Sequence, residues 1–417
     1  MLEKFFDSSA RGLARVRGLR NGLHGSLLDS FSTDLLHSRY ANITARKHLR
    51  SAEHFFHWAS RNGVLLPQWN EDALERFGRH LRQHRCAYGH SRPENQLTGA
   101  SLFLTHLQVS GRIDSQPVGR AVDPALLTAF RHWMREQRGT QDKTLDNYDI
   151  PIRALLKHVG EDPKRLDARS LRLCFLKHCD GKGHAVIKHG ATALRMFVRF
   201  LIAEGRCPAG LEAAIPLVPH WRLSSLPRYL QPEEVERIVA SCDSTTAVGK
   251  RDRAILLLLA RLGLRAGDIV QLHLSDIDWK GAWVQVCGKS RRQTRLPLTQ
   301  EVGDAIVAYL QDGRPQTDGD RVFVCCRAPF RPFASHAAVS VIVDQAMRRA
   351  GVEPPGRGAA HLLRHSVATS LLRQGVSLQD IAAVLRHRSI QTTQIYAKVD
   401  ISTLHQIAQS WPEVQPC

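Results

Sequence analysis

The sequence lacks any long hydrophobic segment. Its longest purely apolar run has seven residues, Ala254 to Ala260, and lies between Arg253 and Arg261. A helix that crosses a bilayer needs about 20 predominantly apolar residues, so we expect no membrane association. The nine cysteines are odd in number and form no C-x-x-C pair. This pattern argues against a disulfide framework or a zinc ribbon and indicates reduced thiols in the cytoplasm.

Acidic residues are scarce relative to basic ones. The 417 residues include 39 Asp and Glu against 58 Lys and Arg, which gives a formal net charge of +19. Hydrophobic residues make up 43% of the chain and charged residues 23%, a composition that excludes a mainly disordered protein. The length predicts more than one domain, and the positive excess predicts a polyanionic partner.

The positive charge is concentrated in the N-terminal half. Residues 1–230 hold 35 basic and 21 acidic residues, a net charge of +14, whereas residues 231–417 hold 23 and 18, a net charge of +5. One alternative is that these side chains only solvate helix faces. The size of the excess favours instead an N-terminal half that holds a phosphate backbone.

The N-terminal half contains two stretches with a similar apolar pattern. Helix-like runs begin at Thr44 and Thr144, and the two sets close with Gly-Arg pairs at Gly111 and Gly205. We interpret them as tandem helical units; the alternative is that any two helical bundles share such spacing. The predicted division is an extension at 1–30, helical units at 31–118 and 122–214, a proline-rich linker at 215–230, a C-terminal domain at 231–400 and a tail helix at 401–417.

The C-terminal domain mixes helical and strand periodicity. Trp283 to Val286 and Thr294 to Leu298 alternate as strands around a basic turn at 288–293, which predicts a hairpin. Helices are predicted at 231–240, 252–262, 299–312, 336–350, 363–374, 378–385 and 391–398. We therefore expect a mainly α fold, in which tandem helical bundles precede a helix-rich α+β domain with a small sheet.

Four short motifs in the last 160 residues bring together arginine, lysine, histidine and tyrosine side chains. They are Gly263-Leu-Arg265-Ala-Gly-Asp268, Gly288-Lys289, His361-Leu-Leu-Arg364-His365, and Leu385-Arg386-His387-Arg388-Ser389 followed by Tyr396. Each residue alone has an ordinary interpretation, such as a surface arginine, a turn lysine or a core tyrosine. The ordered set is much more specific than any member.

This ordered set resembles the tyrosine recombinase (phage integrase) family. His361 to His365 match the family's second arginine motif, Gly263-Leu-Arg265 resembles the first, and the segment from Gln391 to Val399 resembles the nucleophile segment. Gly288-Lys289 with Arg295 to Leu298 looks like the family's β-hairpin. The resemblance covers about 228–400, and it implies that the two helical units are SAM-like, the second being the core-binding domain and the first an extra DNA-binding unit.

The resemblance implies a role for each of these residues. Tyr396 would be the nucleophile that forms a covalent 3′-phosphotyrosine, which stores the bond energy so that strands rejoin without ATP or another cofactor. Arg265 and Arg364 would clamp the phosphate, because guanidinium forks match the charge on its non-bridging oxygens. The remaining predicted roles are proton donation by Lys289, phosphate contacts by His361 and His387, support by Asp268 and His365, and DNA binding by Arg291, Arg292, Arg386 and Arg388.

Two positions depart from the family pattern. Arg386 stands where family members commonly have glycine, so we expect it either to displace His387 slightly or to contact DNA. Leu362 fills a slot that the motif leaves free. His361 and His365 also have the spacing of a zinc-binding H-E-x-x-H helix, but Leu362 replaces the required Glu, so we expect no metal.

These features together predict a site-specific DNA recombinase for integration, excision or transposition. Its expected partners are double-stranded DNA and its own copies in a tetramer, or sister recombinases in a mixed assembly, on the bacterial nucleoid. The tail helix would pack on its own domain or on a neighbouring protomer. The competing prediction is an accessory subunit that binds DNA with little or no cleavage of its own.

Overall fold

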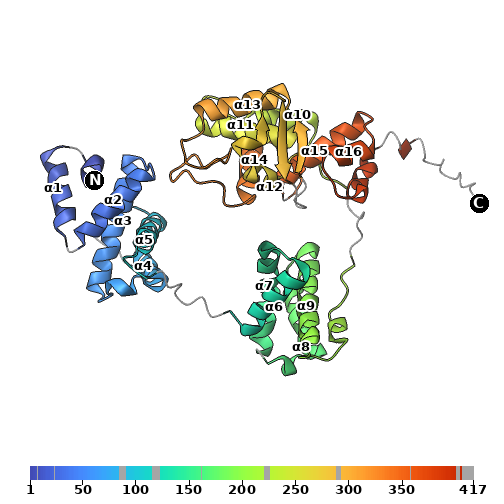
Figure 1. Cartoon of the computed structure of the whole chain (residues 1–417), viewed down its shortest axis with the longest axis horizontal. Helices are drawn as coiled ribbons and strands as arrows, with labels where there is room; N and C mark the ends of the chain where they lie inside the picture. Colours follow the sequence, from blue (N-terminus) through green and yellow to red (C-terminus); the bar gives the residue numbers. More distant parts are fainter. Residues whose placement is uncertain are drawn as a thin grey trace, which may run out of the picture. The chain divides into compact units, whose positions relative to one another are not determined.

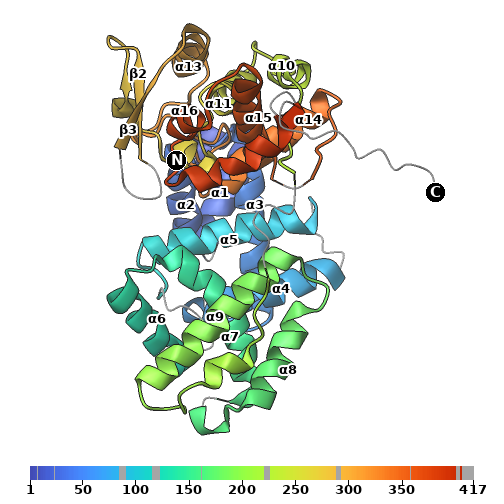
Figure 2. The ribbon, with the colours of Figure 1, turned by 90° about the vertical axis from the view of Figure 1, so that its right-hand side faces the viewer.

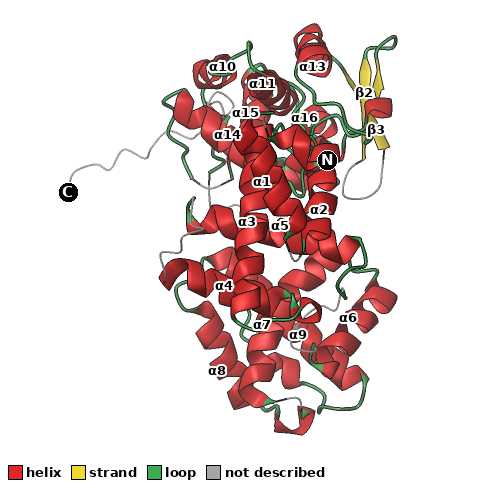
Figure 3. Cartoon of the chain, turned by 90° about the vertical axis from the view of Figure 1, so that its left-hand side faces the viewer, coloured by secondary structure: helices red, strands yellow, loops and turns green. Residues whose placement is uncertain are grey.

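The structure is a computed structural model that describes residues 1–6, 8–22, 24–83, 91–114, 123–160, 162–219, 226–287, 293–356, 358–400 and 404–405. The chain divides into two compact units. The first consists of Met1–Leu65, Leu74–Ser110 and Leu223–Cys417, and the second of Leu66–Ala73 and Gly111–Arg222. Helices dominate both units, and the described strands form one small three-stranded sheet (Figure 1, Figure 3). This confirms the predicted mainly α fold.

The N-terminal part of the chain is helical from its first residues. It contains η1 (Leu2–Phe5), α1 (Ala10–Asn21), α2 (Gly25–His37), α3 (Asn42–Arg61), η2 (Leu66–Gln68), α4 (Glu71–Gln83) and α5 (Pro93–Val109). Helix α3 packs against α2 and α5 and buries the apolar face that includes Leu49 and Phe55. The predicted boundary between residues 30 and 31 falls inside α2, and Leu2 and Phe5 are fully buried. The expected separate extension is therefore part of this helical packing.

The second unit contains its own core. Besides η2 and the start of α4, it contains α6 (Ala125–Arg138), α7 (Asp142–Val159), η3 (Pro163–Arg165), α8 (Ala168–Cys179), α9 (His184–Ala203) and η4 (Leu211–Ala214). The rings of Phe130, Phe197 and Phe200 meet at its centre. Asp167 starts α8 by accepting a hydrogen bond from the Ser170 N–H at 2.7 Å. Helix α7 packs on α9 as α3 packs on α5, an arrangement that suits the proposed tandem units.

The C-terminal domain surrounds a central apolar helix. The helices before the sheet are α10 (Pro232–Ala240), α11 (Ala247–Ala260), α12 (Ala266–Gln271) and η5 (Leu274–Asp276). The strands are β1 (Ile277–Asp278), β2 (Trp283–Cys287) and β3 (Gln293–Pro297), and they pair antiparallel in the order β1-β2-β3. Val284 faces Leu296 across this sheet, and both side chains are buried. The run from Ile255 to Leu259 is fully buried in α11, which explains why this segment is apolar on every face.

The last elements carry most of the predicted site. They are α13 (Gln300–Asp312), α14 (Ala337–Arg349), α15 (Ala359–Arg373), α16 (Leu378–Val384), η6 (Ile390–Thr392) and η7 (Gln394–Val399). Helices α15 and α16 lie side by side (Figure 2). The helix predicted at 391–398 is wrong in type, because two short 3-10 turns form there instead. Tyr396 is buried within this segment.

Among the described residues, no helix is both long enough and apolar enough to cross a membrane. The same residues include no group of three or more His, Cys, Asp or Glu side chains placed to hold a metal ion.

Truncation of Phe197 tests the second core. Phe197 is 1% exposed in α9 and its ring contacts Phe130 and Phe200. We expect Phe197→Ala to lower the free energy of unfolding of this unit by about 3–5 kcal/mol, since it removes buried contacts and leaves a cavity. Leu217, which is 84% exposed in the same unit, supplies the control Leu217→Ala. Amide hydrogen exchange along α6 to α9 measures both effects, and equal protection in the two variants would contradict the described core.

Candidate active site

Arg364 lies at the centre of the residues predicted from the motifs. It projects from α15, its side chain is buried, and the residue is 5% exposed. Its Nη1 donates a hydrogen bond to the carbonyl of Gly263, and its Nη2 donates to the carbonyl of Leu385. Burial lowers the pKa of Arg364 to about 9, and the nearby Arg265 and Arg386 add to the effect. One guanidinium therefore joins the turn before α12, helix α15 and the turn after α16.

The turn before α12 depends on Gly263. This residue has φ +56°, and a Cβ there would lie 2.8 Å from Cδ2 of Leu385. Glycine is therefore required both by the left-handed backbone and by the close approach. Arg265 then begins α12, and its backbone N–H donates to Oδ2 of Asp268 at 3.0 Å. The Arg265 Nη2 donates to the carbonyl of Arg386 at 3.1 Å.

Arg386 occupies the position where the family commonly has glycine. It has φ +53°, a conformation that costs a non-glycine residue roughly 1–2 kcal/mol. Its side chain is 6% exposed, and Nη2 lies 2.7 Å from Oδ2 of Asp268. The side chain predicted to bind DNA is therefore turned inward, with its guanidinium beside Asp268. The positive φ is the physical reason for a glycine preference at this turn.

Tyr396 is buried beside His365. Tyr396 is 1% exposed in η7, where it packs with apolar residues of α15 and α16 such as Leu372 and Ile381. Its hydroxyl lies 2.7 Å from Nδ1 of His365. Burial raises the pKa of Tyr396 to about 12 and lowers that of His365 to about 4. Both groups are therefore neutral at pH 7 and held at hydrogen-bond distance.

His387 follows Arg386 and contacts the segment that contains η6 and η7. Its Nδ1 lies 2.8 Å from Oγ1 of Thr393, a fully buried residue. Burial lowers the pKa of His387 to about 4, with further effects of Arg364 and Arg265. The motifs indicated neither Thr393 nor the direct contact of His365 with Tyr396. No sequence signal marks either pair, because the partners come together only through the packing of α15 and α16 with η6 and η7.

The other predicted residues divide into exposed and undescribed ones. His361 is exposed near the start of α15, and Arg388 is exposed in the turn after α16. Lys289, Arg291 and Arg292 lie outside the described residues, as does the predicted tail helix at 401–417 apart from Leu404 and His405. The structure thus brings Arg265, Asp268, Arg364, His365, Arg386, His387 and Tyr396 together.

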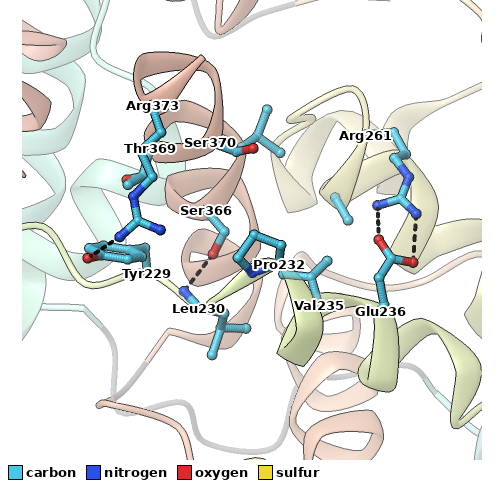
Figure 4. Close-up of a pocket in the computed structure, with 12 residues that line it drawn as sticks. Tyr229, Leu230, Pro232, Val235, Glu236, Arg261, Ser366, Thr369, Ser370 and Arg373 are labelled. Atoms are coloured by element: carbon cyan, nitrogen blue, oxygen red, sulfur yellow. Dashed lines mark hydrogen bonds and ion pairs between the residues drawn. The ribbon is translucent and has the colours of Figure 1, made fainter. Parts of the chain in front are cut away.

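A cavity of about 120 Å³ lies behind α15, and no predicted catalytic residue lines it (Figure 4). Ser366 accepts a hydrogen bond from the Leu230 N–H at 2.8 Å, and Arg373 donates to the Tyr229 hydroxyl at 2.8 Å (Figure 4). These bonds attach the segment before α10 to the face of α15 that turns away from Arg364. We interpret this contact as one that holds α15 in place.

Alanine at Gly263 tests the close approach that positions Arg364. We expect Gly263→Ala to lower the free energy of unfolding by at least about 1–2 kcal/mol, because Ala is strained at positive φ and its Cβ meets Leu385. Gly267 in α12 is exposed, and a Cβ there meets nothing within 4 Å. The matched variant Gly267→Ala should be neutral or stabilising by about 0.5–1 kcal/mol. Thermal unfolding of both variants measures these changes. An unchanged stability of Gly263→Ala would contradict the described close approach to Leu385.

The buried histidines predict a pH dependence of stability. His365 and His387 have pKa values lowered to about 4 in the folded protein, below the value of about 6.5 of an unfolded chain. The unfolded state therefore binds more protons as the pH falls from about 6.5 to 4, so stability present above pH 6.5 is lost across this window.

The variant His365→Gln should show a flatter fall of the thermal midpoint between pH 7 and pH 4.5 than the parent protein. His132→Gln, at an exposed position of α6, is the control. Parallel profiles for the parent and His365→Gln would contradict the burial of a neutral histidine.

Known proteins are similar to this chain in sequence and in fold. The model described as the phage integrase family matches residues 228–402. The y4rA integrase/recombinase of Sinorhizobium fredii (strain NBRC 101917 / NGR234) is 34% identical over 388 residues, which is 92% of this chain and 93% of that protein. Tyrosine recombinase XerD of Lacticaseibacillus casei is 29% identical over 288 residues, which is 68% of this chain and 96% of XerD.

Solved structures share the fold at lower identity. The XerH recombinase in a post-cleavage complex with a palindromic difH substrate has a TM-score of 0.55 at 18% identity, covering 84% of this chain and 96% of XerH. A lambda integrase dimer bound to a COC′ core site has a TM-score of 0.52 at 19% identity, covering 69% of this chain and 98% of that one. With the motifs, the fold and a relative matched over nearly its full length, the chain belongs to the phage integrase family of tyrosine recombinases.

Proposed function

We propose that this protein is a site-specific recombinase that cleaves and rejoins double-stranded DNA through a 3′-phosphotyrosine intermediate. The observation that carries the proposal is the position of Arg364, which hydrogen-bonds the first arginine motif through Gly263 and the third motif through Leu385. Arg364 thus joins three motifs, the first and last of which are more than a hundred residues apart in the sequence. A phosphate bound at Arg364 would therefore lie close to residues of all three motifs.

Tyr396 serves as the nucleophile in this proposal. Its oxygen attacks the phosphorus, a phosphotyrosyl bond forms, and the bond to the 5′-oxygen breaks. The phenol must lose a proton, and the nearest acceptor is Nδ1 of neutral His365, 2.7 Å away. The departing 5′-oxygen takes up a proton, a role that the family resemblance assigns to Lys289. Rejoining reverses these steps, so no external energy source is consumed.

The arginines stabilise the charge of the reacting phosphate. Arg265 and Arg364 are fixed through main-chain carbonyls, so their guanidinium groups are preorganised for an anion. Asp268 holds the N–H of Arg265 and so sets the start of α12. His387 and the exposed His361 would contact the same phosphate.

Because Tyr396 is 1% exposed, a DNA phosphate can reach its hydroxyl only when the η7 segment shifts. We therefore include a movement of residues 394–399 on DNA binding in the proposal.

Double-stranded DNA and further recombinase subunits are the proposed partners. The net charge of +14 on residues 1–230 suits a backbone-driven and salt-sensitive grip. A lambda integrase structure is a tetramer bound to a Holliday junction, which supports a tetramer for this chain, either of its own copies or with sister recombinases. The outcome of this reaction would be integration, excision or transposition of DNA. We propose that the protein acts on the bacterial nucleoid, away from membranes.

Replacement of Tyr396 tests the chemistry. The substrate is a nicked duplex selected by binding from DNA that flanks the gene, so that cleavage releases a short strand and traps the adduct. We expect Tyr396→Phe to abolish the SDS-resistant protein–DNA adduct, since it removes the attacking oxygen, while DNA binding stays within about twofold. Tyr148→Phe, which keeps the ring that packs on the second core, should form the adduct normally.

Two results would contradict the proposal. If the parent protein binds the duplex and forms no adduct, the accessory-subunit alternative is favoured. If Tyr396→Phe still forms the adduct, another residue is the nucleophile.

A further inference from the structure

The side chain of Arg386 points into the cluster that contains the two predicted phosphate clamps. We propose that Arg386 is a third phosphate-binding guanidinium, so that this site holds the DNA phosphate with three arginines. The inference rests on the proposed function for the identity of the anion. It adds to that function a residue that the family pattern, with its usual glycine, does not supply.

The turn at 385–386 holds both clamps through its main chain. The carbonyl of Leu385 accepts from Arg364, and the carbonyl of Arg386 accepts from Arg265. The Arg386 side chain leaves this same turn and reaches Asp268, whose Oδ2 already accepts the Arg265 N–H. The guanidinium groups of Arg265, Arg364 and Arg386 thus lie in one cluster, in which the guanidinium of Arg386 binds the Asp268 carboxylate.

The guanidinium of Arg386 is buried but only partly bonded. Its side chain is 6% exposed, and Nη2 binds Asp268. Its Nε and Nη1 have no hydrogen-bond partner among the described residues. A buried charged donor without a partner is costly, and a phosphate oxygen would satisfy it. The positive charge of Arg386 also acts on its neighbours, because it contributes to the lowered pKa values of Arg265, Arg364 and His387. This excess of positive charge favours an anion at the cluster.

Glycine could form the turn at position 386 equally well, so arginine adds only its side chain to the site. At φ +53° a glycine fits without strain. The main-chain bond from Arg265 to the residue 386 carbonyl needs no side chain. Strained conformations of this kind are concentrated at functional sites. Arg386→Gly therefore removes the third cation while it keeps the backbone that the other two arginines use.

Inorganic phosphate is the first probe. In the full-length protein, the rise of the thermal midpoint with phosphate, compared with chloride at equal ionic strength, reports phosphate binding. We expect Arg386→Gly to weaken phosphate binding about tenfold, as for loss of a charge-assisted hydrogen bond. Arg386→Lys should recover part of the loss, because it restores the charge without the fork. Arg348→Gln, at an exposed cation of α14, should bind phosphate like the parent.

The rate of covalent adduct formation on the nicked duplex is the second measurement. We expect Arg386→Gly to slow it about tenfold or more, with Arg386→Lys intermediate. If Arg386→Gly does not fold, Arg386→Asn carries the same expectation, since asparagine tolerates positive φ and has no charge.

Three results overturn the inference. Unchanged phosphate affinity and adduct rate in Arg386→Gly would show that the side chain plays no part. A changed midpoint in chloride with an unchanged phosphate effect would show a purely structural role. Tighter phosphate binding would show that Arg386 obstructs the site. If the parent protein forms no adduct, the proposed function fails, and the phosphate measurement still decides the role of Arg386.

Discussion

The arrangement of the whole site depends on one buried cation, Arg364, held between two main-chain carbonyls. A buried guanidinium is tolerated only where hydrogen-bond acceptors replace water, and here Gly263 and Leu385 supply them. The neighbouring turns must therefore place these two carbonyls beside Arg364. The Gly263 carbonyl is in place because the turn has positive φ, and the turn can approach Leu385 because glycine has no Cβ. The same approach places Arg265 beside the carbonyl of Arg386.

The site carries more positive charge than its own carboxylate can balance. Arg265, Arg364 and Arg386 lie around Asp268, and the mutual effect of the cations with burial lowers the pKa of Arg364 to about 9. This repulsion costs stability in the free protein. Under the proposed function, a phosphate would relieve the repulsion and form hydrogen bonds at the same time. Part of the free energy that the repulsion costs would then be recovered on anion binding.

The local sequence pattern predicted many of the helices and strands. His361, Arg364 and His365 share a helix face because three- and four-residue spacings do so, and the hairpin strands follow from alternation. Contacts between distant segments could not be predicted. The pairing of Arg386 with Asp268 spans 118 residues and that of His365 with Tyr396 spans 31, and neither leaves a periodic signal. The 3-10 turns at 390–399, where Tyr396 is buried, were likewise not predicted from the local pattern. The boundary expected at residue 31 falls inside α2, and the preceding helix α1 buries Val16 and Leu19 although it is rich in arginine.

In its buried environment, Tyr396 is a protonated phenol. Burial raises its pKa to about 12, and the neutral His365 beside it, with a pKa lowered to about 4, is a weak proton acceptor in this arrangement. A phenol in this setting is a weak nucleophile, so reactivity cannot come from the resting pKa. In the proposed reaction it arises when η7 moves the oxygen toward the phosphate and the arginines, where positive charge favours the phenolate. The groups proposed to bind the phosphate would then also activate the attacking oxygen. Cleavage without a correctly bound phosphate would be disfavoured, because the phenol would keep its proton.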